Sequence, residues 1–342
     1  MKYDFTSILD RRGKDAVAVD AVGAPGSSYP APREGFDVIP MWVADMNFPT
    51  VPTVPAAIIE RAAHPAYGYF NPSEAYIGAI LRWQERRHGV TCLTRENLGY
   101  ENGVLGGVVS ALSIFCSRGD NVLLHTPTYV GFTHALRDNG YNMVLSPLVQ
   151  DAAGVWRMDF DDMERRIVEN RIHAAVFCSP HNPTGRVWER WEVERFTELC
   201  AKHGVYIISD EIWSDIVRPG AVHTPTQSVS EDAKNRTLSL YAPSKTFNLA
   251  GLVGSYHIAY DPWILDRMKK ASSLPHYNSM NVLSMHALAA AYSPEGEAWT
   301  DELCAVIAGN IDFACDYIRE RFDGVEVTKP EGTYMLFADC TK

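Results

Sequence analysis

The stretch TLSLYAPSKTFNLAG at residues 237–251 contains Lys245, and its pattern is the most informative in the chain about fold and function. Residues 237–241 predict a short buried strand, and Asn248 and Gly251 favour a turn and a closely packed connection after it. A lysine at the end of a buried strand is costly, since lysine is rarely buried without a partner. Taken alone, it would be a surface lysine after an edge strand. Desolvation, however, lowers the pKa of an ammonium and leaves an amine that can condense with a carbonyl group.

On both sides of this stretch, short apolar runs alternate with amphipathic runs. Further buried strands are predicted at residues 121–125, 174–179, 205–209 and 255–260. Between them, Asp159 can cap one helix, and a second helix carries apolar residues at helical spacing over 193–200. Continuous apolar strands separated by helices indicate a mainly parallel sheet covered on both faces, which is an α/β fold. In such sheets the ligand binds at the carboxyl ends of the strands.

Three polar side chains are expected at that edge of the sheet. Asn182 lies in the sequence SPHNPTG at residues 179–185, where two prolines and a glycine predict a rigid loop. Asp210 comes directly after a buried strand, where a carboxylate must be paired or neutralised. Each has an ordinary alternative, a turn asparagine and a helix N-cap. With Lys245, they could converge on one small ligand.

Two further features are weaker signals. Residues 101–107, ENGVLGG, precede an apolar helical run, and the free N–H groups at a helix start can bind an anion. The segment is neither a Walker A loop nor a dinucleotide fingerprint, and by itself it more often serves helix packing. Tyr129 places an aromatic ring after the strand at 121–125, although a single ring at such a position is more often part of the core.

Length and composition exclude several classes of protein. The chain of 342 residues can form one large domain and one smaller domain. Its net charge of −11 argues against a nucleic-acid or anionic-membrane partner. It shows neither a signal-peptide pattern nor an apolar run of membrane-spanning length. The seven cysteines lack zinc spacing and CxxC pairs, so we expect no metal site and a reduced, cytoplasmic protein.

Taken together, Asn182, Asp210 and Lys245 resemble the fold type I pyridoxal 5′-phosphate (PLP) enzymes of the aminotransferase class I/II family. Their order and their separations of 28 and 35 residues fit that family, and the resemblance covers nearly the whole chain. It implies a mainly parallel sheet sandwiched by helices, with a smaller α+β domain. The expected domains are a large PLP-binding domain over residues 49–280 and a small domain formed by residues 1–48 and 281–342.

One branch of the family matches more closely. Residues 41–48, MWVADMNF, are similar to the WVADMDF signature of the cystathionine β-lyase, or C–S lyase, branch, which includes the PatB and MalY proteins. Residues 67–69 and 244–251 also suit that branch. Asn47 stands where the branch usually has Asp. Trp213 stands where relatives carry Tyr or His, so the phenolic hydrogen bond that some of them make to the cofactor is not carried over.

The resemblance implies a role for each matched residue. Lys245 holds PLP covalently and afterwards moves the Cα proton of the substrate, and Asp210 pairs with the pyridinium nitrogen. Asn182 hydrogen-bonds the ring oxygen and Tyr129 stacks on the ring. The other cofactor contacts are expected from Trp213, from Ser244 and the backbone amides of Val104 and Leu105 at the phosphate, and from Tyr69 of the neighbouring subunit. The substrate is expected to contact Ala44, Asp45 and Asn182.

Two functional residues of the family have no counterpart in this sequence. Val253 stands eight residues after Lys245, where many relatives place a basic residue that binds the phosphate. The family also binds the substrate α-carboxylate with an arginine beyond a segment like residues 330–337. The chain ends at Lys342, before that arginine. We expect the sequence to be incomplete at this end of the small domain, rather than to encode a truncated enzyme of impaired activity.

The resemblance predicts a homodimeric, PLP-dependent C–S β-lyase. Its substrate would be L-cystathionine or a related cysteine conjugate, and its products a thiol, pyruvate and ammonia. A PLP-dependent aminotransferase is the alternative, because both reactions begin with removal of the Cα proton and diverge only afterwards. A third possibility, from another class, is a PLP-fold regulator that binds a transcription factor.

Overall fold

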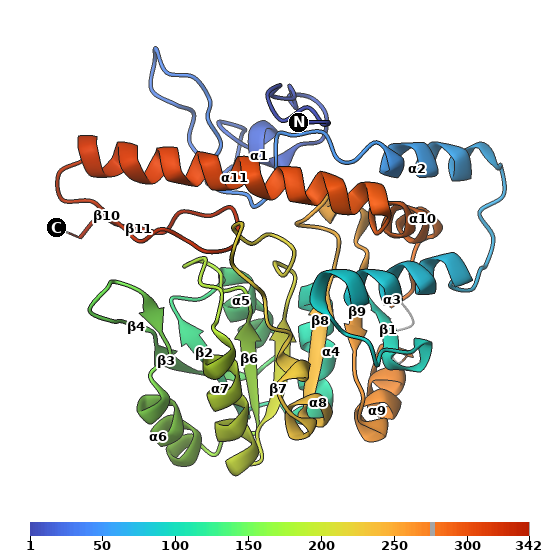
Figure 1. Ribbon diagram of the computed structural model, residues 1–342, viewed down its shortest axis with the longest axis vertical. Coiled ribbons are helices and arrows are strands. Elements are labelled where there is room, and N and C mark those ends of the chain that lie inside the picture. Colours follow the sequence, from blue (N-terminus) through green and yellow to red (C-terminus); the bar gives the residue numbers. More distant parts are fainter. Residues whose placement is uncertain (274–277, 342) are drawn as a thin grey trace.

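The computed structural model describes residues 1–273 and 278–341. Within them, a seven-stranded sheet has the order β1-β9-β8-β7-β6-β2-β3 (Figure 1). Its strands are β1 Leu98–Glu101, β2 Asn121–Thr126, β3 Asn142–Pro147, β6 Ala174–Cys178, β7 Tyr206–Asp210, β8 Thr237–Tyr241 and β9 Ser255–Ile258. All pairs from β3 to β8 are parallel, whereas β9 runs antiparallel to both of its neighbours. The predicted mainly parallel sheet is confirmed.

Helices cover both faces of this sheet. One face carries α4 Val104–Phe115, α5 Val130–Asp138 and α9 Pro262–Ser273, and the other carries α6 Phe160–Asn170 and α7 Arg190–Lys202, with α8 Glu231–Arg236 beside α7. Neighbouring apolar residues of one strand serve opposite faces, because successive side chains of a strand alternate. Ile207 packs with α6 and α7, and Ile208 packs with α4. Asp159 caps α6, as predicted, by accepting a 3.0 Å hydrogen bond from the Asp162 amide.

A second layer lies across the carboxyl ends of the strands, and its longest element is α11, Pro294–Arg321 (Figure 1). Around it lie the N-terminal segment with α1 Val17–Asp20, helices α2 Thr53–Ala63 and α10 Val282–Ala291, and the strand pair β10 Glu326–Val327 and β11 Ala338–Asp339. The remaining elements are α3 Glu74–His88, the pair β4 Val149–Gln150 and β5 Trp156–Arg157, and the 3-10 turns η1 Arg95–Asn97, η2 Thr226–Ser228 and η3 Ala250–Leu252. Across the described parts of the chain, no helix combines the length and apolarity needed to cross a membrane.

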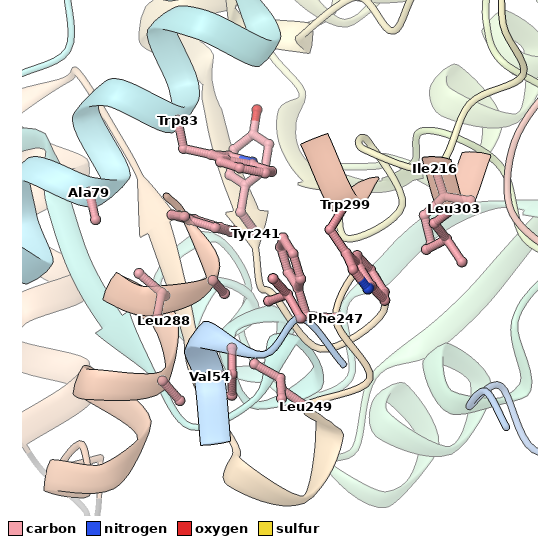
Figure 2. Close-up of a cluster of buried hydrophobic side chains, with 14 of the residues drawn as sticks. Val54, Ala79, Trp83, Ile216, Tyr241, Phe247, Leu249, Leu288, Trp299 and Leu303 are labelled. Carbon is pink, nitrogen blue, oxygen red and sulfur yellow. The ribbon is translucent and has the colours of Figure 1, made fainter. Parts of the chain in front are cut away.

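A buried aromatic cluster joins the second layer to the sheet (Figure 2). Phe247, six residues after β8, lies between Trp83 of α3 and Trp299 of α11. Its ring centroid is 5.7 Å from that of Trp83, in an edge arrangement, and 5.4 Å from that of Trp299, in a stacked one. Aromatic pairs at these distances stabilise beyond the area they bury. The turn that follows β8 is therefore part of a packed core.

Candidate active site

The three polar residues predicted at strand ends follow three adjacent strands. Asn182 follows β6, Asp210 is the last residue of β7, and Lys245 follows β8. These strands are neighbours and parallel, so their carboxyl ends share one edge of the sheet. The register brings Cys178, the last residue of β6, opposite Asp210. The convergence expected from the sequence is therefore built into the topology of the sheet.

Asp210 is a buried carboxylate that requires a cation. Only 4% of the residue is exposed, and its Oδ1 accepts a 3.1 Å hydrogen bond from the amide of Ile212. Burial raises the pKa of Asp210 to about 7, while the Ile212 hydrogen bond and the charge of Lys245 act in the opposite direction. A carboxyl group in this position gains from a positive charge beside it. A protonated ring nitrogen beside Asp210 would supply that charge.

Lys245 is half-buried at the same edge. Its Nζ donates a 3.0 Å hydrogen bond to the carbonyl oxygen of Ala44 and lies 5.5 Å from the ring centroid of Trp213. Burial lowers the pKa of the Lys245 ammonium, and the carboxylates of Asp210 and Asp45 partly oppose that shift. Desolvation thus favours the neutral amine, which is the form that attacks a carbonyl carbon.

Residues 44–47 form a strap across Lys245, and two side chains hold it in place. Asn248 accepts a 3.0 Å hydrogen bond from the Met46 amide and donates one of 2.9 Å to the Met46 carbonyl. Its φ of 58° is a left-handed conformation that asparagine tolerates. Arg11 binds Asp45 through two hydrogen bonds of 2.9 and 2.6 Å. The side chain of Asp45, a predicted substrate contact, is thus engaged by Arg11.

The anion site predicted from residues 101–107 falls at the start of α4. Gly103 precedes the helix with a φ of 79°, a conformation that glycine adopts without strain, and it offers no capping side chain. The first N–H groups of a helix have no partner within it, so those of Val104 and Leu105 can bind phosphate oxygens. A Cβ atom on Gly103 would lie 3.9 Å from the Cγ1 of Val253. Val253 therefore borders this site, where the family resemblance predicts a basic residue, but it contributes an aliphatic side chain.

Tyr129 and Trp213 contribute aromatic rings near these polar groups. Tyr129 immediately precedes α5, and its ring lies over Gly131, where a Cβ atom would collide with it and approach Leu105. Burial raises the pKa of Tyr129, and the charge of Asp210 adds to the shift, which places the phenol near that carboxylate. Trp213 is buried and meets the ring of Tyr334 edge-on, with centroids 4.7 Å apart. Both residues thus lie where the sequence placed them, beside Asp210 and Lys245.

The loop that presents Asn182 is held by internal hydrogen bonds, and Arg186, which the sequence did not single out, also braces it. Arg186 is buried, donates a 2.6 Å hydrogen bond to Glu192 and also pairs with Glu331. The loop closes on itself through a 2.8 Å bond from the His181 amide to the carbonyl of Arg186. The sequence pattern did not reveal these roles of Arg186 and Arg11. Asp45 and Glu331 are far along the chain from the arginines they bind, and Glu192 is not at a helical i+3 or i+4 spacing from Arg186.

Tyr69 is the one predicted cofactor contact that projects away from these residues. It lies on the loop between α2 and α3, where its side chain is fully exposed in the single chain. It borders a surface groove of about 860 Å³ whose lining also includes Tyr67, Phe70 and Tyr100. An exposed tyrosine beside an open groove cannot be assigned to the site of its own chain.

The α/β fold and this set of polar groups define a class of enzyme. A helix start that can bind phosphate, a buried acid and a desolvated lysine meet at one edge of a mainly parallel sheet, which is the arrangement of a fold type I cofactor enzyme. Residues 37–342 match the family model described as aminotransferase class I and II. The chain belongs to that family, and the family predicted from the sequence is confirmed.

Named relatives refine this assignment. Cystathionine beta-lyase PatB of Bacillus subtilis (strain 168) is 35% identical over 305 residues, which are 89% of this chain and 78% of PatB. Protein MalY of Escherichia coli (strain K12) is 30% identical over 340 residues, 98% of this chain and 84% of MalY. The crystal structure of a PLP-bound C–S lyase from Staphylococcus hominis has a TM-score of 0.87 and 32% identity, covering 98% of this chain and 82% of that one. The predicted branch and fold type are confirmed.

Proposed function

We propose that this chain is a PLP-dependent C–S β-lyase, which cleaves L-cystathionine or a related cysteine conjugate to a thiol, pyruvate and ammonia. The observation that carries the proposal is the placement, at one sheet edge, of the desolvated Lys245 amine and the buried Asp210 carboxyl group, each of which shifts the pKa of the other. The similarity to PatB and to the S. hominis C–S lyase supports this reaction over others of the family. An aminotransferase remains the alternative, supported by the breadth of the family itself.

The residues described above fit PLP at each of its polar ends. The N–H groups of Val104 and Leu105, with Ser244, would hold the phosphate, and Asp210 would pair with the ring nitrogen. The raised pKa of Asp210 is the structural sign of this fit, because the chain itself surrounds the carboxyl group with little positive charge beyond Lys245. The ring would be contacted by Tyr129, Trp213 and Asn182.

The chain's own groups account for the first chemical step. When bound, PLP withdraws electrons from the Cα of the substrate amino acid. The Lys245 amine then takes the Cα proton, and the carbonyl of Ala44, 3.0 Å from Nζ, orients that amine. Asp210 is buried and Lys245 half-buried at this edge, and charges act more strongly where water is excluded. Whether a thiolate then leaves from Cβ depends on the substrate.

Arg11 adds a function to the strap. We assign the backbone of Ala44 and Asp45, with Asn182, to the substrate α-carboxylate. The Asp45 side chain would repel that carboxylate, but Arg11 binds both of its oxygens in a pair only about one-fifth exposed. Neutralising Asp45 in this way lowers the repulsion that an anion would meet at the strap.

Pyruvate release tests the reaction directly. The purified protein with PLP and L-cystathionine, without any keto acid, is expected to release pyruvate and ammonia in equal amounts over many turnovers. A keto acid is needed only by an aminotransferase, because it regenerates the cofactor. L-alanine, which has no leaving group at Cβ, serves as the matched substrate and should release no more than one equivalent per site. Product that appears only when a keto acid is supplied would instead establish the aminotransferase.

We further propose that the active unit is a homodimer in which Tyr69 reaches the phosphate of the neighbouring subunit. The exposed aromatic residues Tyr67, Tyr69 and Phe70 beside the 860 Å³ groove support this, since such a surface gains from being covered.

We also propose two domains, a large one over residues 49–280 and a small one formed by residues 1–48 and 281–342. Their support is the layer around α11 that lies over the sheet (Figure 1), in which α2, numbered with the large domain, packs against α10 of the small one. The cytoplasmic location expected from the sequence remains a prediction.

Mixing two inactive variants tests the shared site. Tyr69→Ala and Lys245→Ala homodimers should both be weak or inactive in pyruvate release. After they are unfolded and refolded together, half of the dimers are mixed, and each mixed dimer has one site with both residues intact. Activity is expected to recover to about a quarter of the wild-type value, as two-fold symmetry requires. Tyr67→Ala mixed with Lys245→Ala is the matched control. No recovery from the Tyr69 mixture would place Tyr69 in its own subunit's site, whereas a fully active Tyr69→Ala homodimer would place it outside catalysis.

A further inference from the structure

We infer that Asp215 is a positioning residue that acts through Thr246 to fix Lys245 relative to Asp210. The inference rests on the proposed function only in taking Lys245 as the reacting lysine. Asp215 and Thr246 touch neither substrate nor cofactor in this assignment. Their effect is exerted through the backbone of the two turns that carry the reacting groups.

Asp215 joins three elements with one carboxylate. It lies on the turn after β7, the strand that ends at Asp210, and only 4% of the residue is exposed. Its Oδ2 accepts a 3.0 Å hydrogen bond from the Thr246 hydroxyl, on the turn after β8. Its Oδ1 accepts a 3.0 Å bond from the Trp83 indole of α3 and lies 3.2 Å from Nε2 of His88. The two catalytic turns are therefore tied to each other and to α3.

Lys245 is held from its C-terminal side by three consecutive residues. Thr246 binds Asp215, Phe247 packs in the aromatic core shown in Figure 2, and Asn248 binds the strap at Met46. Of these anchors, the Thr246 bond is the one that leads directly to the turn of Asp210. Thr246 also adjoins Lys245 in the chain, so a shift of its backbone moves the Cα of Lys245 with it. Nζ would then be displaced from the substrate Cα.

The carboxylate of Asp215 depends for its charge on His88 and Arg87 more than on Thr246, whose hydrogen bond makes a smaller contribution to its lowered pKa. Burial acts to raise the pKa of Asp215, but the hydrogen bond and charge of His88 and the charge of Arg87 outweigh burial, so that its pKa is lowered. These groups remain when the Thr246 hydroxyl is removed. Thr246→Val therefore deletes the link between the turns without leaving a buried charge unpaired. Replacing Asp215 itself would leave the Trp83 and His88 donors without their acceptor.

The experiment compares Thr246→Val with Thr246→Ser, which keeps the hydroxyl. Thr300→Val is the matched control, because Thr300 is also fully buried and its hydroxyl donates a 2.8 Å bond to the Gly296 carbonyl within α11. Two quantities are measured on the PLP-loaded proteins. One is kcat and KM for pyruvate release from L-cystathionine. The other is the pH midpoint of the visible absorption of the resting enzyme, which needs no substrate.

Thr246→Val is expected to lower kcat about tenfold with KM nearly unchanged, because proton transfer is displaced while the carboxylate contacts remain. The absorption midpoint should shift by about half a pH unit or more. Thr246→Ser should restore both values, and Thr300→Val should alter neither. If Thr246→Val fails to fold, Thr246→Ala, which adds no atoms, takes its place with the same expected split.

The inference is wrong if the loss in Thr246→Val lies in KM, equals that of Thr300→Val, or is not restored by serine. An absorption midpoint that stays in place in Thr246→Val would also overturn it. Failure of the proposed function looks different: the wild-type protein then releases no pyruvate from L-cystathionine, while the midpoint of Thr246→Val still shifts from that of the wild type.

Discussion

Lys245→Ala is expected to lower kcat/KM for pyruvate release by on the order of 10⁴-fold, because it removes the amine assigned to the Cα proton. The same change should abolish the absorption band that PLP shows when it is attached to the protein. Folding should be little affected, since Lys245 contributes one hydrogen bond, to the Ala44 carbonyl, and its burial already disfavours the charged form. Steady-state kinetics and an absorption spectrum measure the two effects.

Lys202→Ala is the matched control for this change. Lys202 is an exposed residue at the end of α7 whose ammonium pairs with Glu164, away from the carboxyl ends of the strands. Its removal should change kcat/KM by less than a factor of about two. A Lys245→Ala protein that keeps the attached-cofactor spectrum would contradict the assignment of Lys245, whatever its activity.

Asp210→Asn should have opposite effects on activity and on stability. The amide can accept the Ile212 hydrogen bond but carries no charge, so it cannot keep a ring nitrogen protonated. Loss of this electrostatic contribution should lower kcat/KM by about 10²- to 10³-fold. The cofactor-free protein, in contrast, should become more stable at high pH, because the pKa of Asp210 is about 7 in the folded chain against an ordinary value of 3.8.

The pH dependence of this stabilisation follows from proton linkage. Between about pH 4 and 7, folded Asp210 holds a proton that the unfolded chain has released, so the stability of the cofactor-free wild type falls as pH rises. Asparagine stays neutral throughout. The two proteins should therefore have similar free energies of unfolding near pH 4. At pH 8 the variant should be more stable by about 4 kcal/mol.

Urea unfolding of the cofactor-free proteins at pH 4 and pH 8 measures the difference. Asp266→Asn, an exposed carboxylate of α9 paired with Lys270 four residues on, is the control and should change stability by less than about 0.5 kcal/mol at either pH. An Asp210→Asn protein that is destabilised at pH 8 would show that the chain itself, without PLP, stabilises the charged carboxylate.

Much of this site could be predicted because its parts are local in sequence. The strand predicted at 237–241 is β8, and those at 121–125, 174–179 and 205–209 agree with β2, β6 and β7 to within one residue. The prediction at 255–260 extends two residues beyond β9, which ends at Ile258. Buried strands are recognisable from continuous apolar runs, and the residues that follow them are then placed by counting.

The residues that the sequence did not reveal act at long range. Arg11 meets Asp45 34 residues away, Asn248 meets Met46 202 residues away, and Thr246 meets Asp215 31 residues away. An arginine or a threonine with such partners has the same local pattern as one on the surface. The antiparallel direction of β9 was equally hidden, because an apolar run does not state which way its strand runs.

The sequence by itself determined the sheet and the strand ends, because continuous apolar runs mark the buried strands. It also marked Asn182, Asp210 and Lys245 as site residues, because residues that follow parallel strands lie together at the carboxyl edge of the sheet. Only the tertiary structure decided how these groups are tuned. Burial raised the pKa of Asp210 and lowered that of Lys245, and distant partners fixed the strap and the lysine turn. Desolvation and long-range hydrogen bonds depend on what surrounds a side chain in space, and that environment exists only once the chain has folded.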